Sequence, residues 1–467
     1  MTSQCRTAVP SSRSSFALLR DPVVGPFFFG KLLSTAGIWV HNITAVIVVF
    51  HLTGSAALVG VVSVAQFAPQ LLLTPWSGAR ADRADRRPQL IAGRLITAVG
   101  SGGLAVGITA FGLSGVPGAF AVIAAALVVG IGFALGGPAM ESSLPSMVGP
   151  SEVAAVVALN SVPLTLGRAG GPALGALLVT IGGPTLAFSV AAATQLVFAL
   201  ILAMVIRETG RTAPSDASMR GGLRYVRRDP ALAALLVGTA AVGIGADPAI
   251  TLAPSFADSL GGGSQLAGTL ASSFGVGAAS TFLVLGWCSR RFGVERLAGG
   301  GLLLIAMGLV ALAFSPHEVP ALLALGMAGA GMTLALTSVT TLIQHRAPEE
   351  LRGRIMALWA IAFLGCRPFA AALNGSIADL TSATVAALGT AVVVVCGAWF
   401  VRPSRLRPEA AAFSARGSND SLHSRTGSIT TAKEGHPPSP TRRVRPWSDP
   451  STRPTRPSSG LNRWRRR

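Results

Sequence analysis

The sequence predicts an all-α polytopic membrane protein with twelve transmembrane helices in two six-helix, pseudo-symmetric halves. Half of its 467 residues are hydrophobic and 12% are charged, whereas a soluble chain carries about a quarter charged residues. Beyond residue 401 lie 15 of the 38 basic and 4 of the 19 acidic residues. The remaining charges cannot cover a water-soluble globule of this size. Composition therefore excludes a soluble enzyme.

Glycine, proline and charged residues divide the apolar part into twelve runs, each close to the roughly 20 residues that cross a bilayer. The ten-residue alternation typical of a membrane β-barrel is absent, so we expect helices. The expected spans are 26–50, 55–77, 89–113, 118–140, 154–181, 184–206, 230–254, 264–286, 297–315, 319–343, 354–376 and 381–401.

The distribution of arginine predicts the orientation of these spans. Connections after spans two, six, eight and ten are basic, whereas connections after the odd-numbered spans contain no Lys or Arg. Basic loops remain on the cytoplasmic side. We therefore expect a multi-pass protein of the cell (inner or plasma) membrane with both termini in the cytoplasm, because eleven or thirteen spans would break the alternation.

Similar segments recur in the two halves. Residues 150–153 (Pro-Ser-Glu-Val) resemble residues 348–351 (Pro-Glu-Glu-Leu), and Gly167 corresponds to Gly365, both at an offset of 198. Residues 78–87 are echoed by 286–296 at an offset of 208. Two parallel six-helix repeats are common among secondary transporters. The alternative is chance, since Pro and Glu also begin unrelated helices well.

We divide the chain into five parts by composition. The tail carries a net charge of +11 and few aliphatic residues, so it cannot form a core and is expected to be disordered. Its arginines suit anionic membrane lipids; the alternative, a nucleic-acid partner, is not favoured. The parts are a cytoplasmic N-terminal segment, an N-terminal half, a basic cytoplasmic linker, a C-terminal half and a disordered basic cytoplasmic tail: 1–22, 23–206, 207–229, 230–401 and 402–467.

The connection between spans two and three carries a distinctive motif. Residues 78–87 read Gly-Ala-Arg-Ala-Asp-Arg-Ala-Asp-Arg-Arg. This resembles the signature loop of the major facilitator superfamily, Gly-x-x-x-Asp-Arg-x-Gly-Arg-Arg/Lys, with Asp85 replacing the family's second Gly. In that family the loop Asp docks on span eleven and latches the cytoplasmic side shut. By this resemblance the latch residues are Gly78, Asp82, Arg83, Arg86, Arg87 and Glu141.

A simpler interpretation of this region is also open. The four loop arginines would then only keep the loop in the cytoplasm. Glu141, at the inner end of span four, would only partner one of them.

Span five contains a second motif. Residues 167–176 resemble the exporter-associated motif of the same superfamily, Gly-x-x-x-Gly-Pro-x-x-Gly-Gly, with Ala at the last position. Its members here are Gly167, Gly171, Pro172 and Gly175. Small residues allow close helix approach, and proline kinks a helix. The resemblance favours export; the alternative is ordinary membrane-helix glycine in a chain that has 55 of them.

Residues 137–145, 158–161 and 346–356 look like those of the bacterial subgroup that contains the enterobactin exporter. The resemblance implies efflux of a drug, siderophore or secondary metabolite by proton antiport. The sequence departs from that subgroup in span one, where residues 36–41 include no acid. It also lacks the span-four arginine of many drug/proton antiporters.

Ionisable residues inside spans are costly and are functional candidates. Asp247, before Pro248 in span seven, is the preferred proton site; its alternative role is structural, at a helix break. His41 is the reserve, because its unperturbed pKa of about 6.5 suits proton transfer. His41 and Asn42 could equally form a hydrogen-bonded helix contact. Lys31, near the end of span one, is expected to snorkel.

Arg168 in span five and Arg367 in span eleven are the arginines that we place deep in spans. Neither can lose its charge. They could bind an anionic substrate or pin a carboxylate. Together with Asp247 and His41–Asn42 they form the candidate substrate and proton site.

The sequence therefore predicts a secondary transporter that exports a small amphiphilic molecule by alternating access, in exchange for protons. The alternative is an uptake permease or an uncoupled facilitator. No catalytic triad, metal-ligand cluster or cofactor loop is recognisable, so we expect no enzyme activity, no metal and no cofactor. The expected partners are a small-molecule substrate, protons and membrane lipids, and we expect a monomer.

Overall fold

The computed structural model describes residues 15–83, 85–143, 148–149, 152–206 and 219–406, and within these ranges every regular element is a helix. Eleven of the helices are long and apolar enough to cross a membrane. One of them, α6, contains two of the expected spans, so the predicted twelve-span, all-α fold is confirmed. Residues 407–467 of the C-terminal tail, where disorder was predicted, lie outside the described residues. Residues 403–406 at the start of that tail form a short helix, so the expected boundary at 402 was a few residues too early.

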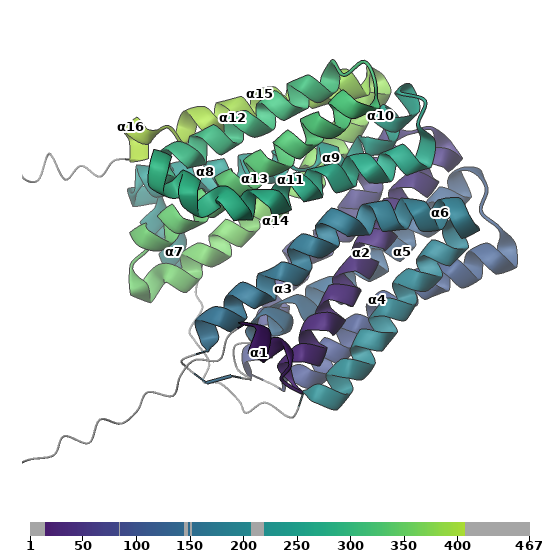
Figure 1. The fold of residues 1–467 in the computed structure, drawn as a ribbon, viewed down its shortest axis with the longest axis horizontal. Coiled ribbons are helices and arrows are strands. Elements are labelled where there is room, and N and C mark those ends of the chain that lie inside the picture. The colour runs from purple at the N-terminus through teal and green to yellow at the C-terminus, as the bar shows by residue number, and fades with distance from the viewer. Residues whose placement is uncertain (1–14, 84, 144–147, 150–151, 207–218, 407–467) are drawn as a thin grey trace, which may run out of the picture. The chain divides into compact units, whose positions relative to one another are not determined.

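The first half begins with a short helix and continues with five long ones (Figure 1, purple into blue). These are α1 (Ser15–Leu19), α2 (Val24–Thr53), α3 (Ala56–Arg83), α4 (Arg86–Phe111), α5 (Gly115–Ser143) and α6 (Val153–Val205). Helix α6 is broken where Gly182 and Gly183 leave helical geometry, Gly183 with a φ of 71°. A left-handed residue followed by proline ends one helix and starts the next.

The second half contains the remaining helices (Figure 1, teal to yellow-green). These are α7 (Met219–Arg228), α8 (Pro230–Gly245), α9 (Pro248–Thr251), α10 (Ala253–Ser259), α11 (Gly263–Phe292), α12 (Val294–Ala313), α13 (Glu318–Arg346), α14 (Glu349–Leu380), α15 (Ala383–Phe400) and α16 (Pro403–Leu406).

Span seven differs from its expected continuous form. It consists of α8, α9 and α10, with breaks at Ala246–Asp247 and at Leu252. Pro248 and Pro254 stand just after these breaks, where the lack of a backbone N–H and the fixed φ suit a helix start. The sequence signal for the first break, Asp247-Pro248, was therefore meaningful.

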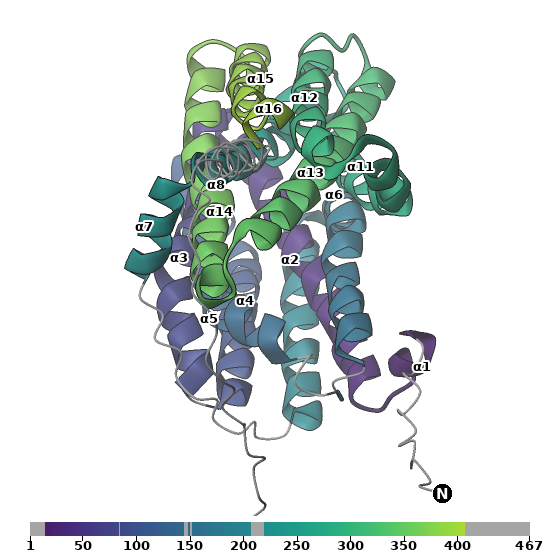
Figure 2. The same cartoon turned by 90° about the vertical axis from the view of Figure 1, so that its left-hand side faces the viewer.

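The described part of the linker is also helical. Helix α7 packs along α14, as Figure 2 shows. Val226 on its inner face is buried. Asp229 then caps α8, because its Oδ1 accepts hydrogen bonds from the backbone N–H groups of Ala231 and Leu232 at 3.0 and 3.1 Å. The linker is thus attached to the second half.

The most extensive contacts between the halves are made by two helix pairs: α3 with α14, and α6 with α11. A β-carbon added at Gly60 of α3 would collide with the carbonyl of Ala371, and one added at Gly268 of α11 would lie 2.7 Å from the carbonyl oxygen of Pro172. Gly60 and Gly268 are 208 residues apart, the offset at which the two basic loops recur. The repeat seen in the sequence therefore recurs as two equivalent interfaces.

Both close contacts lie towards one end of the bundle. We call it the Gly54 end, after the glycine in the turn between α2 and α3. The opposite end, where Asp85 joins α3 to α4, is the Arg86 end.

Candidate functional site

A buried polar cluster surrounds Asp247, which is 2% exposed. Its Oδ1 accepts a hydrogen bond from Thr251 Oγ1 at 2.9 Å, and its Oδ2 accepts one from Asn374 Nδ2 at 2.8 Å. Thr390 Oγ1 in turn donates to Asn374 Oδ1 at 2.6 Å. Thr390 thereby orients the Asn374 amide so that its NH₂ group faces the Asp247 carboxylate. The cluster draws on α9, α14 and α15.

The Asp247 cluster reaches the other half of the molecule. Thr251, which donates to Asp247, lies with its Oγ1 3.5 Å from Ser63 Oγ of α3. The break between α8 and α9 lies at Ala246–Asp247, so Asp247 stands at an interruption within a span. Thr251 therefore links the Asp247 carboxylate to the first half, so protonation of the carboxylate would alter contacts in both halves.

Arg367 connects Asp247 to the second predicted arginine. Its guanidinium attracts Asp247 and repels Arg168, so the three predicted charges share one electrostatic environment. Arg367, on α14, lies over the ring of Phe67 of α3 at 4.3 Å from the centroid. The contact crosses between halves, as does the Asp247 cluster.

Arg168 occupies the equivalent place at the other interface. Its guanidinium lies 5.5 Å from the ring centroid of Trp39 on α2 and 5.3 Å from that of Phe274 on α11. Each arginine thus stands on one half and faces an aromatic ring of the other. Aromatic faces attract cations, which favours these interfacial positions.

Both arginines have unused hydrogen-bond donors. Arg367 is 6% exposed, and its Nε and Nη2 have no partner among the described residues; Arg168 Nε is likewise buried and unpartnered. A buried donor without an acceptor costs free energy. An incoming acceptor group would remove that cost, so the two guanidiniums are equipped to hold a polar ligand.

His41 and Asn42 lie elsewhere. His41 is 1% exposed, with Nδ1 3.0 Å from Ser101 Oγ and its ring 5.2 Å from that of Phe188. It therefore faces α4 and α6 inside the first half. Asn42 accepts a hydrogen bond from Gln66 Nε2 of α3. The structure places neither residue in the Asp247 cluster.

The signature motif is described in part. The side chains of Asp82, Arg83 and Glu141 lie outside the described residues, so the predicted latch contacts stay predictions. Arg86 Nε donates to the Ala81 carbonyl at 3.2 Å, and Arg87 Nη2 to that of Ala203 at 2.6 Å. Gly78 lies within α3, facing Pro138 of α5.

Asp85, which departs from the motif, has a clear role. Its Oδ1 accepts a hydrogen bond from the backbone N–H of Arg87 at 3.0 Å, which makes it the N-cap of α4. Asp is a preferred N-cap residue. The departure therefore supplies a helix start at the position where the family has its second glycine.

The glycines of the span-five motif all face α2. β-Carbons added at Gly167, Gly171 and Gly175 would collide with Thr35, Trp39 and Ile43 respectively. These α2 residues are spaced by one helical turn. The motif therefore packs α6 tightly onto α2, while the neighbouring face of α6, around Pro172, meets α11.

Sequence reasoning missed a third buried arginine. Arg94 of α4 is 3% exposed. Its Nη1 donates to Ser34 Oγ at 3.1 Å and to Gln195 Oε1 at 3.4 Å. Helix α4 begins at Arg86, earlier than expected, so Arg94 lies two turns inside it. Arg94 already lay five residues inside the expected span 89–113, but so near a basic loop its local sequence does not show that it is buried.

Lys31 does not snorkel. The lysine is buried, and its Nζ donates to Asn160 Oδ1 at 2.7 Å and to the Asn160 carbonyl at 3.3 Å. This amide and carbonyl on α6 satisfy the ammonium inside the first half, which explains why it does not reach for water.

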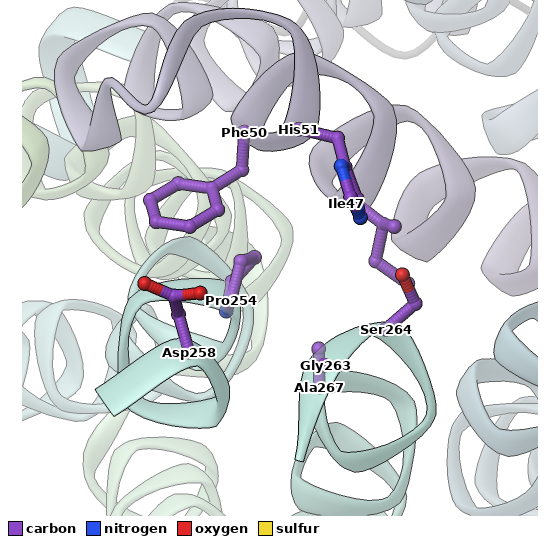
Figure 3. Close-up of a pocket in the computed structure, with 8 residues that line it drawn as sticks. All are labelled: Ile47, Phe50, His51, Pro254, Asp258, Gly263, Ser264 and Ala267. Atoms are coloured by element: carbon purple, nitrogen blue, oxygen red, sulfur yellow. The ribbon is translucent and has the colours of Figure 1, made fainter. Parts of the chain in front are cut away.

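A small pocket lies between the halves at the Gly54 end (Figure 3). One wall comes from the end of α2 and the other from α10 and the start of α11. Its lining residues are Ile47, Phe50, His51, Pro254, Asp258, Gly263, Ser264 and Ala267. Among the described residues, no group of three or more His, Cys, Asp or Glu could hold a metal ion.

Comparison with known proteins places this fold in a family. A family described as "Transmembrane secretion effector", of the major facilitator superfamily, matches residues 13–430. The chain is 24% identical over 325 residues to the enterobactin exporter of Shigella flexneri, covering 68% of this chain and 76% of that protein. It is also 24% identical over 387 residues to the enterobactin exporter of Shigella boydii, covering 81% and 91%.

Solved structures share the fold. A bacterial homologue of the human lysosomal transporter Spinster, inward-facing and unoccupied, superposes with a TM-score of 0.67 at 17% identity, covering 83% of this chain and 96% of that one. A D-xylose-proton symporter gives 0.65 at 15% identity, covering 81% and 98%.

Proposed function

Because the chain belongs to the transmembrane secretion effector family of major facilitator superfamily transporters, we propose that it exports a small amphiphilic molecule in exchange for protons. It is a transporter and not an enzyme. The relatives named as enterobactin exporters support export, and the span-five motif agrees with it. The cargo is a siderophore, a drug or a secondary metabolite.

The proposal of proton coupling rests on Asp247. It is the buried carboxylate that the described structure places in the interior of a span. Asn374 of the second half donates a hydrogen bond to it, and Thr251, which also donates to it, contacts Ser63 of the first half. Its neutral form suits a low-dielectric site, and its charged form is compensated by Asn374, Thr251 and Arg367. Both protonation states therefore have a place within one structure, as a proton carrier requires.

Exchange follows if protonated Asp247 and bound substrate exclude each other. In the cytoplasm-facing state the carboxylate loses its proton and accepts hydrogen bonds from the cargo. In the outward-facing state a proton from outside replaces them and the cargo leaves. Arg168 and Arg367 supply further donors for acceptor groups of the cargo.

We propose that the protein works as a monomer in the cell membrane, with both termini in the cytoplasm. Basic connections at the Arg86 end support this orientation. The Gly54 end is then the outer side. Its close contacts between α3 and α14 and between α6 and α11 correspond to an outer side that is shut, so cargo would load from the cytoplasm. The basic linker and tail would face anionic lipids.

Transport by purified protein in liposomes tests this proposal. The probes are enterobactin and the dye ethidium, with a pH gradient of either direction imposed across the membrane. We expect movement of a probe against its gradient, opposite to the proton flow. Asp247→Asn should abolish this gradient-driven movement and leave probe binding measurable, whereas Glu295→Gln, an exposed acid at the start of α12, should transport normally.

Other outcomes distinguish the alternatives. Movement in the direction of the proton flow would establish an uptake permease. Movement that ignores the pH gradient would establish an uncoupled facilitator. If Asp247→Asn remains fully coupled to the pH gradient and His41→Gln does not, the proton site is His41 and not Asp247.

A further inference from the structure

The turn between α2 and α3 presents a helix start to the other half of the molecule. Gly54, with a φ of 66°, ends α2. Ser55 follows as the N-cap of α3, and its Oγ accepts a hydrogen bond from the backbone N–H of Leu58 at 3.2 Å. Helix α3 is 28 residues long, so the first turn carries the full positive end of a helix dipole.

Asp379, in the last turn of α14, binds this helix start. Its Oδ1 accepts a hydrogen bond from the backbone N–H of Ala56, and its Oδ2 accepts one from Ser55 Oγ, both at 2.5 Å. An ordinary N-cap lies on the helix that it caps. Here the capping carboxylate belongs to the other half, 323 residues further along the chain.

This contact stands beside a close approach of the two halves. One turn before Asp379, a β-carbon at Gly375 would collide with the Ala56 carbonyl, and the next turn back meets Gly60 through Ala371. Close backbone packing brings the helices together, but it carries no charge. Asp379 adds two charge-assisted hydrogen bonds, which are about twice as strong as neutral ones.

We propose that Asp379 is a positioning residue of the transport cycle, which holds the outer end of α14 on α3 while the cargo site faces the cytoplasm. When the halves rock to open the outer side, α14 must leave α3, and both hydrogen bonds must break. The proposal needs the alternating access of the family and the orientation given above, but not the direction of transport. Its failure would therefore leave export untouched.

The same helix pair would then carry a capping carboxylate at each end. The signature motif predicts that Asp82, at the end of α3, docks on the start of α14 when the inner side closes. Asp379, at the end of α14, docks on the start of α3 when the outer side closes. Alternation between the two would keep each closed state stable without a permanent bond between the halves.

Spin-label distances in the full-length protein test the proposal. Labels at Phe111→Cys and Phe314→Cys, exposed at the Gly54 end of each half, report its opening in lipid nanodiscs, with the natural cysteines replaced by serine. We expect Asp379→Asn to raise the outward-open fraction by about threefold to tenfold, the loss of roughly one net hydrogen bond. Thermal stability should change little, because Asp379 is exposed.

Two further variants complete the test. Glu318→Gln is the matched control, since Glu318 is an exposed acid in the first turn of α13, at the same end and in the same half. It should leave the distances unchanged. Ser55→Ala should shift them less than Asp379→Asn, and should add nothing in the double variant. Unchanged distances in Asp379→Asn, an equal shift in Glu318→Gln, or additive effects in the double variant would overturn the proposal.

Discussion

Replacing Gly171 by alanine tests the tight packing of α6 on α2. The added methyl group would collide with the β-carbon of Trp39 and lie 3.2 Å from the carbonyl oxygen of Ala36. Forcing a methyl group into a filled contact costs about 1–3 kcal/mol. Alanine also favours a helix over glycine by roughly 0.5–1 kcal/mol, which partly offsets this cost.

The adjacent residue provides the control. A β-carbon at Gly170 would meet nothing within 4 Å, so Gly170→Ala should gain only the stability that alanine adds to a helix in place of glycine. The difference between the free energies of unfolding of the two variants cancels that shared gain and leaves the cost of the collision, about 1–3 kcal/mol.

Thermal unfolding in detergent measures this difference. For a chain of this length we expect Gly171→Ala to unfold roughly 1–3 °C below Gly170→Ala. Tryptophan fluorescence is a suitable probe, because Trp39 is at the contact. Equal midpoints for the two variants would show that the span-five motif does not pack against α2 in the way described.

Two other predictions concern the first half and the tail. Arg94→Ala should destabilise the protein by about 2–4 kcal/mol, because it removes two hydrogen bonds and leaves a void beside Phe133. Arg291→Ala, at an exposed position, should change stability by less than about 0.5 kcal/mol in the same unfolding assay. Truncation after Arg407 should leave membrane insertion and transport intact, measured by yield and by liposome transport; loss of folded protein would contradict the expected dispensability of the tail.

The spans followed from the sequence because they depend on composition over twenty residues, and the arginine loops separated them. The direction in which a single side chain points depends on the rotation of its helix, which composition does not determine. For His41, the contact with Ser101 depends on the packing of α2 on α4.

The hydrogen-bond partners of Asp247 that lie far along the chain could not be predicted. Asn374 lies 127 residues after Asp247, and nothing in either segment indicates that the two would meet. Arg94 was missed for a related reason: near a basic loop, an arginine that reaches water and one that is buried have the same local sequence. Only the neighbouring Ser34 and Gln195 distinguish them.

Asp247, the one deep carboxylate that the described residues contain, also limits the energy that the transporter can use. If Asp247 carries the proton, no more than one proton enters per cycle through the described spans. Exchange for a neutral cargo then moves one net charge across the membrane, so the rate should respond to voltage as well as to pH. One charge gains about 2.3 kcal/mol per 100 mV, which corresponds to a cargo gradient of roughly fiftyfold. A cargo with one negative charge would move two net charges per cycle, and the part of its gradient that the voltage supports would then be the square of that ratio.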